Sequence, residues 1–154
     1  MMKRCATRKL VFTGMMLAAL APLGSSAAEP EDVIKYRKNM MQAIGGHASA
    51  AGAIVQGKVD YKAHLAEHAR ALQALTKDIP ALFPKDSDFG DTKAKDEVWT
   101  KRTDFEKAAK NVRTRVAAFA KAVQGGNPQV ITASFKDMGE GCKACHKDFR
   151  KEEK

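Results

Sequence analysis

Two cysteines and a histidine near the C-terminus form the strongest chemical pattern in the chain. Cys142, Cys145 and His146 fit the spacing C-x-x-C-H, which is the attachment signature of c-type haem. Side chains three residues apart lie on one face of a helix, so both thiols can bond the two vinyl groups of one haem. The following imidazole can ligate the iron. The segment therefore predicts one covalent haem c, attached at both cysteines, with His146 as an axial iron ligand.

Three other uses of a C-x-x-C pair compete with haem attachment. A structural zinc site needs four ligands, and the chain has no second cysteine pair. A thioredoxin-like redox pair needs an α/β context, which the helical pattern does not offer. A simple disulfide is the third alternative. The histidine that follows the second cysteine favours haem over all three.

A second, weaker pattern lies in residues 64–68, which read His-Leu-Ala-Glu-His. H-x-x-E-H is an inverted zinc-protease signature, in which His64 and His68 share a helix face and Glu67 acts as the base. The chain is short for a protease, however, and no third ligand is evident. A zinc hydrolase is therefore a remote alternative, and solvated histidines are the preferred interpretation. His47 is likewise interpreted as a helix-face residue and not as a ligand.

The opposite face of the iron requires a residue from another helix. Met40 and Met41 lie on the expected inner face of the first helix, and methionine is an axial ligand that raises the reduction potential of haem. The alternative is that both methionines are ordinary core residues that fill gaps.

The elements that position these residues are predicted to be four amphipathic helices, with no convincing strand. Pro30, Asp60 and Asn127 favour helix starts, whereas Gly57, Pro80 and the Gly125-Gly126 pair favour helix ends. The connection at residues 80–94 is long, and its aromatic residues Phe83 and Phe89 are expected to pack. The chain is therefore predicted to be all-α, an antiparallel four-helix bundle with haem in its core. The helices are expected at about residues 31–56, 60–79, 95–124 and 127–149.

Residues 1–28 have the pattern of a signal peptide. Four basic side chains precede an apolar stretch at residues 10–23, and Ser-Ala-Ala at residues 26–28 offers a cleavage site. Pro22 and Gly24 interrupt the apolar stretch, which is too short for a membrane span, so no stable anchor is expected after cleavage. Removal of four basic groups and no acidic one lowers the formal charge from +9 to +5. The prediction is a periplasmic protein, with residues 29–154 as a single domain.

The sequence resembles the class II c-type cytochromes, the cytochrome c′ family and its low-spin relatives. The resemblance covers residues 30–154 and rests on three segments. Residues 142–150 read Cys-Lys-Ala-Cys-His-Lys-Asp-Phe-Arg, close to the C-terminus. Residues 31–41 read Glu-Asp-Val-Ile-Lys-Tyr-Arg-Lys-Asn-Met-Met, and Phe83-Pro84 leads through Gly90-Asp91 to Glu97-Val98-Trp99.

The resemblance implies roles for several residues around a haem held in a four-helix bundle, often as a homodimer. It implies that Arg37, and also Lys38, lies near a haem propionate, which fits the need of a buried carboxylate for a charged partner. It also implies that Met41 lies over the distal face of the iron, and that Arg150 lies close to the proximal side.

The family divides at the distal face of the iron. In cytochrome c′ proper the iron is five-coordinate and binds nitric oxide or carbon monoxide. In the low-spin relatives a methionine ligates the iron, and electron transfer is the expected role. The segment at residues 80–87 looks more like the low-spin branch. The first interpretation is therefore an electron carrier, with gas binding as the alternative.

The expected partners follow from charge and composition. A net positive surface can attract an acidic redox partner protein. Nucleic-acid binding has little support, because the basic residues are dispersed among acidic ones and the aromatic residues lie on inner faces. Neither interpretation of the haem makes the protein an enzyme.

Overall fold

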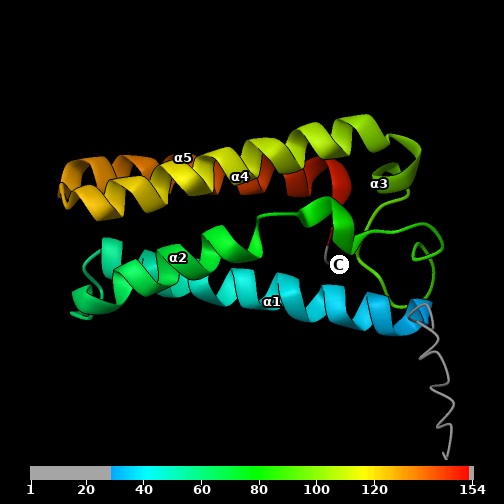
Figure 1. Cartoon of the computed structure of the whole chain (residues 1–154), viewed down its shortest axis with the longest axis horizontal. Coiled ribbons are helices and arrows are strands. Elements are labelled where there is room, and N and C mark those ends of the chain that lie inside the picture. The colour runs from blue at the N-terminus through cyan, green and yellow to red at the C-terminus, as the bar shows by residue number, and fades with distance from the viewer. Residues whose placement is uncertain (1–28, 153–154) are drawn as a thin grey trace, which may run out of the picture.

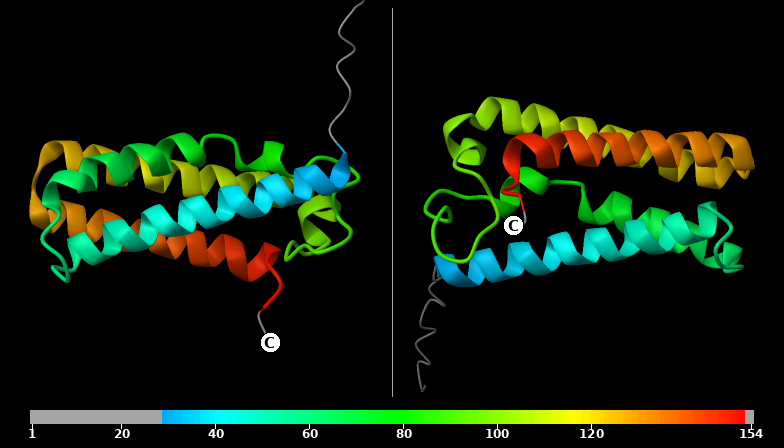
Figure 2. Two further views of the ribbon diagram at one scale, coloured as in Figure 1. Left: turned by 90° about the horizontal axis from the view of Figure 1, so that it is seen from below. Right: turned by 180° about the vertical axis from the view of Figure 1, so that it is seen from behind.

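The computed structural model describes residues 29–152, in which four long helices alternate with short helical turns (Figure 1). Neighbouring long helices run antiparallel, and the pair α4–α5 packs on the pair α1–α2 (Figure 2). The described residues contain no strand, only an isolated bridge between Ala94 and Arg150. The predicted all-α four-helix bundle is confirmed. The elements are α1 (Pro30–Val55), η1 (Lys62–His64), α2 (Leu65–Leu75), η2 (Ile79–Leu82), α3 (Glu97–Thr100), α4 (Arg102–Gly125) and α5 (Pro128–Phe149).

Several helix ends follow the local signals in the sequence. Pro30 lies in the first turn of α1, and its lack of an N–H costs nothing there. Gly57 follows α1 with φ of 68°, a left-handed conformation that glycine adopts without strain. Its N–H donates to the Ile54 carbonyl at 3.0 Å, and that of Lys58 donates to the Ala53 carbonyl at 2.9 Å. These two bonds form a Schellman motif, which satisfies the last carbonyls of α1.

The second predicted helix is shorter than expected. It starts with the 3₁₀ turn η1, and Asp60 forms an ion pair with Lys62 at 3.6 Å instead of capping a helix. It ends at Leu75, where the hydroxyl of Thr76 donates to the Leu72 carbonyl at 2.8 Å. The prediction that the helix spans residues 60–79 is therefore wrong at both ends. Asp78, with φ of −143° and ψ of 64°, leaves helical geometry, and the chain then enters η2 with Pro80 in its first turn, where the missing N–H of proline is tolerated.

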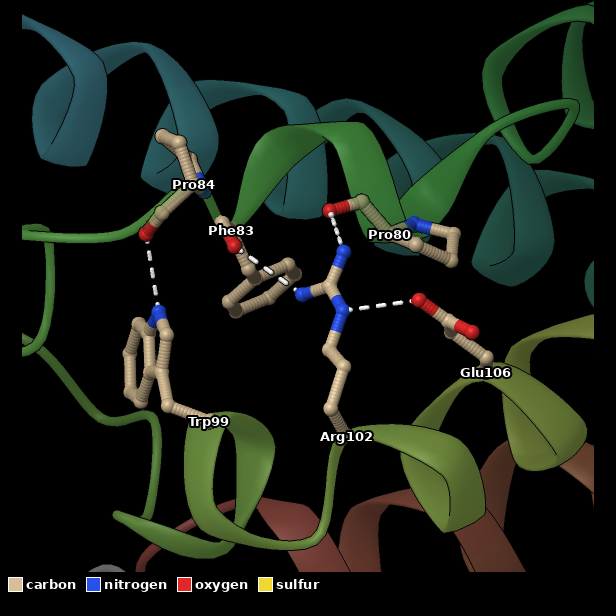
Figure 3. Close-up of polar contacts among 6 residues, drawn as sticks. All are labelled: Pro80, Phe83, Pro84, Trp99, Arg102 and Glu106. Carbon is tan, nitrogen blue, oxygen red and sulfur yellow. Dashed lines mark hydrogen bonds and ion pairs between the residues drawn. The ribbon is translucent and has the colours of Figure 1, made fainter.

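The third predicted helix is two helices. Lys101, with φ of −113° and ψ of 46°, separates α3 from α4. Arg102 is the first residue of α4. Its guanidinium donates to the carbonyls of Pro80 and Phe83, both at 3.0 Å (Figure 3). Trp99 of α3 donates from Nε1 to the Pro84 carbonyl at 2.8 Å. The break therefore lets α3 fasten the loop while α4 runs along α5.

The core lies between α2, α4 and α5, and its largest buried side chain is Phe119. Removing an aliphatic or aromatic side chain of this size from water contributes about 1.5–3 kcal/mol of stability. No helix within residues 29–152 combines the length and apolar character that a membrane crossing requires. Core side chains less than 2% exposed include Ala51, Ala69, Leu72, Val98, Val116 and Phe119.

The long loop and the C-terminal end of α5 differ partly from expectation. Phe83 is buried as predicted, but Phe89 is 47% exposed, so the prediction that both aromatic residues pack is wrong for Phe89. The end of α5 is held against the segment before α3, because Lys95 donates from its backbone N–H to the Phe149 carbonyl at 3.0 Å. Lys151 donates in turn to the Lys93 carbonyl at 2.8 Å. These bonds fix the helix that carries the C-x-x-C-H segment.

Candidate functional site

The two cysteines of the C-x-x-C-H segment lie on α5, half-buried and not disulfide-bonded. Both pack against the main core cluster. Burial raises the pKa of the Cys142 thiol. The pKa of Cys145 is raised to about 11, first by burial and then by the charges of Cys142 and Asp148. A redox-active pair needs the opposite shift, toward thiolate, so the protonated thiols argue against a thioredoxin-like site.

His146 follows the cysteines on the surface of α5. Partial burial of the imidazole, and after it the positive charge of Arg150, lowers the pKa of His146. The neutral imidazole is the form that binds a metal ion. Arg150 ends α5, where its N–H donates to the His146 carbonyl at 2.9 Å, and its backbone pairs with Ala94. The guanidinium of Arg150 therefore influences His146 through charge.

Across from α5, Met41 is half-buried on α1 and packs against the same core cluster as Cys142 and Cys145. Met40 is also half-buried but is not among the side chains that pack against this cluster. Of the two methionines that sequence reasoning left open, only Met41 packs on the core cluster that the cysteines also contact.

The contact between α1 and α5 is uneven along their length. At Gly52 the helices approach closely, since a Cβ on this residue would lie 3.0 Å from Cζ of Phe135. Toward the C-x-x-C-H segment, several apolar side chains on both helices stay half-buried. This apolar surface, with two thiols and a neutral imidazole beside it, fits a large apolar group such as haem. The half-buried side chains are Met41, Ile44, Ala48, Cys142 and Cys145.

Arg37 is 3% exposed, and its guanidinium holds the loop at residues 82–92. It donates to the Leu82 carbonyl at 3.3 Å, and at 2.9 Å each to the hydroxyl and carbonyl of Ser87 and the hydroxyl of Thr92. Its Cζ lies 4.6 Å from the centre of the Phe83 ring, a cation–π contact. Burial lowers the pKa of Arg37. Within residues 29–152 no carboxylate forms an ion pair with this buried cation.

Lys38, the neighbour of Arg37, points to a different part of the same loop. Its ammonium forms an exposed ion pair with the carboxylate of Asp91. The hydrogen bond and charge of Lys38 lower the pKa of Asp91. The loop is thus held to α1 by two adjacent residues, one buried and one exposed.

The residues of the H-x-x-E-H pattern do not form a metal site. His64 stacks on Tyr61 with ring centres 5.6 Å apart, Glu67 forms an ion pair with Arg70, and His68 turns toward α1. No group of three or more His, Cys, Asp or Glu side chains in the described part of the chain could hold a metal ion. The zinc hydrolase alternative is therefore wrong, because its three residues have separate partners.

Sequence reasoning missed two groups of contacts near the site. Nδ1 of His47 lies 3.0 Å from Nδ1 of His68, so α1 and α2 share a hydrogen bond where a simple helix-face residue was expected. It also missed the contacts of Arg102 and Trp99 with the loop in Figure 3. Their acceptors are backbone carbonyls, which have no signature in the sequence.

Comparisons with known proteins give matches along most of the chain. The family model described as cytochrome C′ matches residues 32–150. The cytochrome c′ of Pararhodospirillum photometricum is 35% identical over 124 residues, which cover 80% of this chain and 99% of that protein. Two solved structures of Alcaligenes xylosoxidans cytochrome c prime variants are each 26% identical to the chain. The nitric oxide complex has a TM-score of 0.76, covering 83% of this chain and all of the other. The carbon monoxide complex has a TM-score of 0.75, covering 82% and 100%.

Several independent observations now agree: the helical bundle, the C-x-x-C-H segment on its last helix, the apolar surface beside it and the match along most of the sequence. The chain belongs to the cytochrome c′ family and carries one covalently bound haem c.

Proposed function

We propose that Cys142 and Cys145 hold the haem by thioether bonds, that His146 is the proximal iron ligand, and that the protein binds nitric oxide or carbon monoxide. Each thiol adds to one vinyl group, its sulfur bonding one carbon and its proton going to the other. When bound, the haem supplies an iron with one face open to a small gas. The role is that of a carrier and not of an enzyme.

The position of Met41 is the observation that carries this proposal. Met41 packs against the same core cluster as the two cysteines while remaining half-buried, which supports a role in blocking the distal face. A flexible thioether can move aside for a diatomic ligand. The gas complexes of the related cytochrome c prime variants support the same role.

Arg37 suits a contact with a haem propionate. A buried cation is costly unless a negative group compensates it, and the described residues offer it only neutral acceptors. A propionate would supply the missing charge. Lys38 and Arg150 are proposed as more distant contributors, on the propionate side and the proximal side of the haem respectively.

Electron transfer is the second candidate function, and the chemistry of Met41 favours it. If the methionine sulfur ligates iron, the haem becomes six-coordinate, which suits an electron carrier. Removal of the four basic groups of residues 1–28 reduces the formal net charge from +9 to +5. The mature chain would remain positive and would attract an acidic redox partner.

The proposed location is the periplasm, with residues 29–154 as one mature domain. The signal peptide at residues 1–28 lies outside the described residues. The homodimer implied by the family resemblance stays a prediction. Sedimentation of the purified protein would distinguish a dimer from a monomer.

The test is the visible spectrum of the exported protein, ferric and ferrous, with and without carbon monoxide. Gas binding predicts a high-spin spectrum that shifts with carbon monoxide, and faster gas binding in Met41→Ala with little change at rest. Met40→Ala is the matched control and should behave like the wild type. A low-spin spectrum that ignores carbon monoxide, and responds to it only in Met41→Ala, would establish the electron carrier instead. Absence of covalent haem would contradict both functions.

A further inference from the structure

A close contact between α4 and α5 lies directly before the C-x-x-C-H segment. Gly141 of α5 is buried, and a Cβ added to it would lie 2.6 Å from Cδ of Arg115 and 3.3 Å from its Nε. The same Cβ would lie 3.5 Å from Oδ1 of Asn111. The side chain of Arg115 therefore occupies the space that any residue other than glycine would need at position 141.

A second glycine on the same helix gives a direct comparison. Nothing lies within 4 Å of a Cβ added to Gly139. Glycine inside a helix costs about 1 kcal/mol relative to alanine. At Gly139 no packing offsets this cost, whereas at Gly141 the close approach of Arg115 requires the glycine.

The guanidinium of Arg115 holds α5 one turn earlier. It donates to the backbone carbonyl of Asp137 at 3.1 Å and forms an ion pair with the Asp137 carboxylate. Its Nε donates to Oδ1 of Asn111 at 2.8 Å, one turn back on α4. Asn111 thus orients the guanidinium from its own helix. The side chain contacts α5 from Asp137 to Gly141, which is the turn that leads into Cys142.

These contacts fix how far α5 can slide along α4. A shift of one residue along a helix is about 1.5 Å with a rotation of about 100°, which would turn the cysteines away from the core. We propose that Arg115 is a positioning residue, which through Gly141 and Asp137 sets the height and rotation of Cys142, Cys145 and His146 relative to the core. The inference rests on the proposed haem attachment and extends it to a residue outside the site.

Loss of a purely structural contact would change only the stability of the protein, so the test also measures the spectrum and ligand binding of the haem. The holoproteins compared are the wild type, Gly141→Ala, Arg115→Ala and the variant with both substitutions, with Gly139→Ala as the matched control. The readouts are the ferric spectrum, the rate of carbon monoxide binding to the ferrous protein, and urea unfolding.

We expect Gly141→Ala to change the carbon monoxide rate on the order of tenfold and to alter the ferric spectrum, because a misplacement of about 1 Å can cost up to 10²-fold at a reacting centre. Arg115→Ala should alter both readouts to a smaller extent. Once Arg115 is alanine, the further change Gly141→Ala should add nothing, because the clash is gone. Gly139→Ala should match the wild type in ferric spectrum and carbon monoxide rate, and should unfold at a higher urea concentration because alanine favours the helix.

Wild-type spectra and carbon monoxide rates in Gly141→Ala and Arg115→Ala, even with lowered stability, would overturn the inference while leaving the proposed function intact. If Gly141→Ala does not fold, the same comparison between Arg115→Ala and the wild type decides the matter. A haem-containing wild type that gives no response to carbon monoxide still allows the test through the ferric spectrum and the reduction potential. A wild type without covalent haem would overturn both the proposed function and this inference.

Discussion

The two helices that face the proposed haem are held in different ways. α5 is held at three places along its length: by the Asn127 cap at its start, by Arg115 of α4 at Asp137 and Gly141, and by the bond from Lys95 to Phe149 at its end. α1 packs closely at its C-terminal end around Gly52, but its N-terminal half is held at Arg37, which bonds a loop about fifty residues away in sequence, and at His47. Met41 lies between these two points and stays half-buried. The helix of the proximal side is therefore supported along its length, whereas the distal side depends on Arg37 and a distant loop.

This difference suits the two sides of the proposed site. The proximal side must hold two covalent attachment points and one iron ligand in a fixed register. The distal side must admit or exclude a small ligand, for which a half-buried methionine is sufficient. The following predictions test the comparison, beginning with the largest expected effect.

Removal of the haem attachment should affect both helices together. We expect the variant Cys142→Ala, Cys145→Ala to lack covalent haem and to be poorly folded or degraded, because the inner faces of the helices would line a void. Helical circular dichroism and the yield of exported protein measure this. Ala144→Ser, an exposed change between the cysteines, is the control. A stable apoprotein with native helicity would contradict the prediction.

Loss of the buried arginine should loosen the distal side alone. Arg37→Met removes four hydrogen bonds and leaves the buried hydroxyl and carbonyl oxygens of Ser87 without their donor, while the hydroxyl oxygen of Thr92 still accepts from the N–H of Ala94. We expect a loss of about 3 kcal/mol in the free energy of unfolding. Hydrogen exchange should increase at residues 82–92, while the amides of α5 keep their protection. Lys35→Met, an exposed change on α1, is the control, and equal exchange in α5 and the loop would show that the two sides are not separate.

Removal of the helix cap should weaken the start of α5. The side chain of Asn127 accepts from the backbone N–H groups of Gln129 and Val130 at 3.0 and 3.2 Å. Asn127→Ala should therefore cost about 1 kcal/mol of unfolding free energy. Chemical denaturation measures it, with the exposed substitution Gln129→Ala as the control. Because Cys142 is four turns further along, an altered haem spectrum in this variant would argue against local fixation of α5.

The smallest effect is expected at the exposed ion pair. Lys38 lowers the pKa of Asp91, so the pair contributes stability above the unfolded pKa of the carboxyl, and this contribution is lost as the pH falls through the lower, folded value. In Lys38→Ala the pKa of Asp91 should rise toward its ordinary value. An NMR titration of Asp91 measures this, with Lys35→Ala as the control. An unchanged pKa would mean that Lys93, the weaker cause, maintains the shift instead.

Much of the fold could be predicted because its signals are local. The helices at residues 30–55, 102–125 and 128–149 follow apolar periodicity over one or two turns, and Asn127 caps the last of them as expected. The haem-attachment segment spans only five residues, so its chemistry can be predicted from the sequence without knowledge of any tertiary contact. The errors lie at Thr76, whose hydroxyl bonds the Leu72 carbonyl one turn back, and at Lys101, on either side of which Trp99 and Arg102 bond the distant loop.

The sequence by itself determined the covalent chemistry of the C-x-x-C-H segment and the four-helix class, because spacing within a helix specifies which side chains share a face. Only the tertiary structure decided that Met41 and not Met40 packs on the core cluster, that Arg37 holds the loop, and that Arg115 occupies the space beside Gly141. The polar contacts among these join residues far apart in sequence, since Arg115 and Asp137 are 22 positions apart and Arg37 and Ser87 are 50 positions apart. The groups they contact are backbone carbonyls, neutral hydroxyls and the space left by a glycine without Cβ. The sequence cannot pair such groups, because only the packing of the helices brings them together.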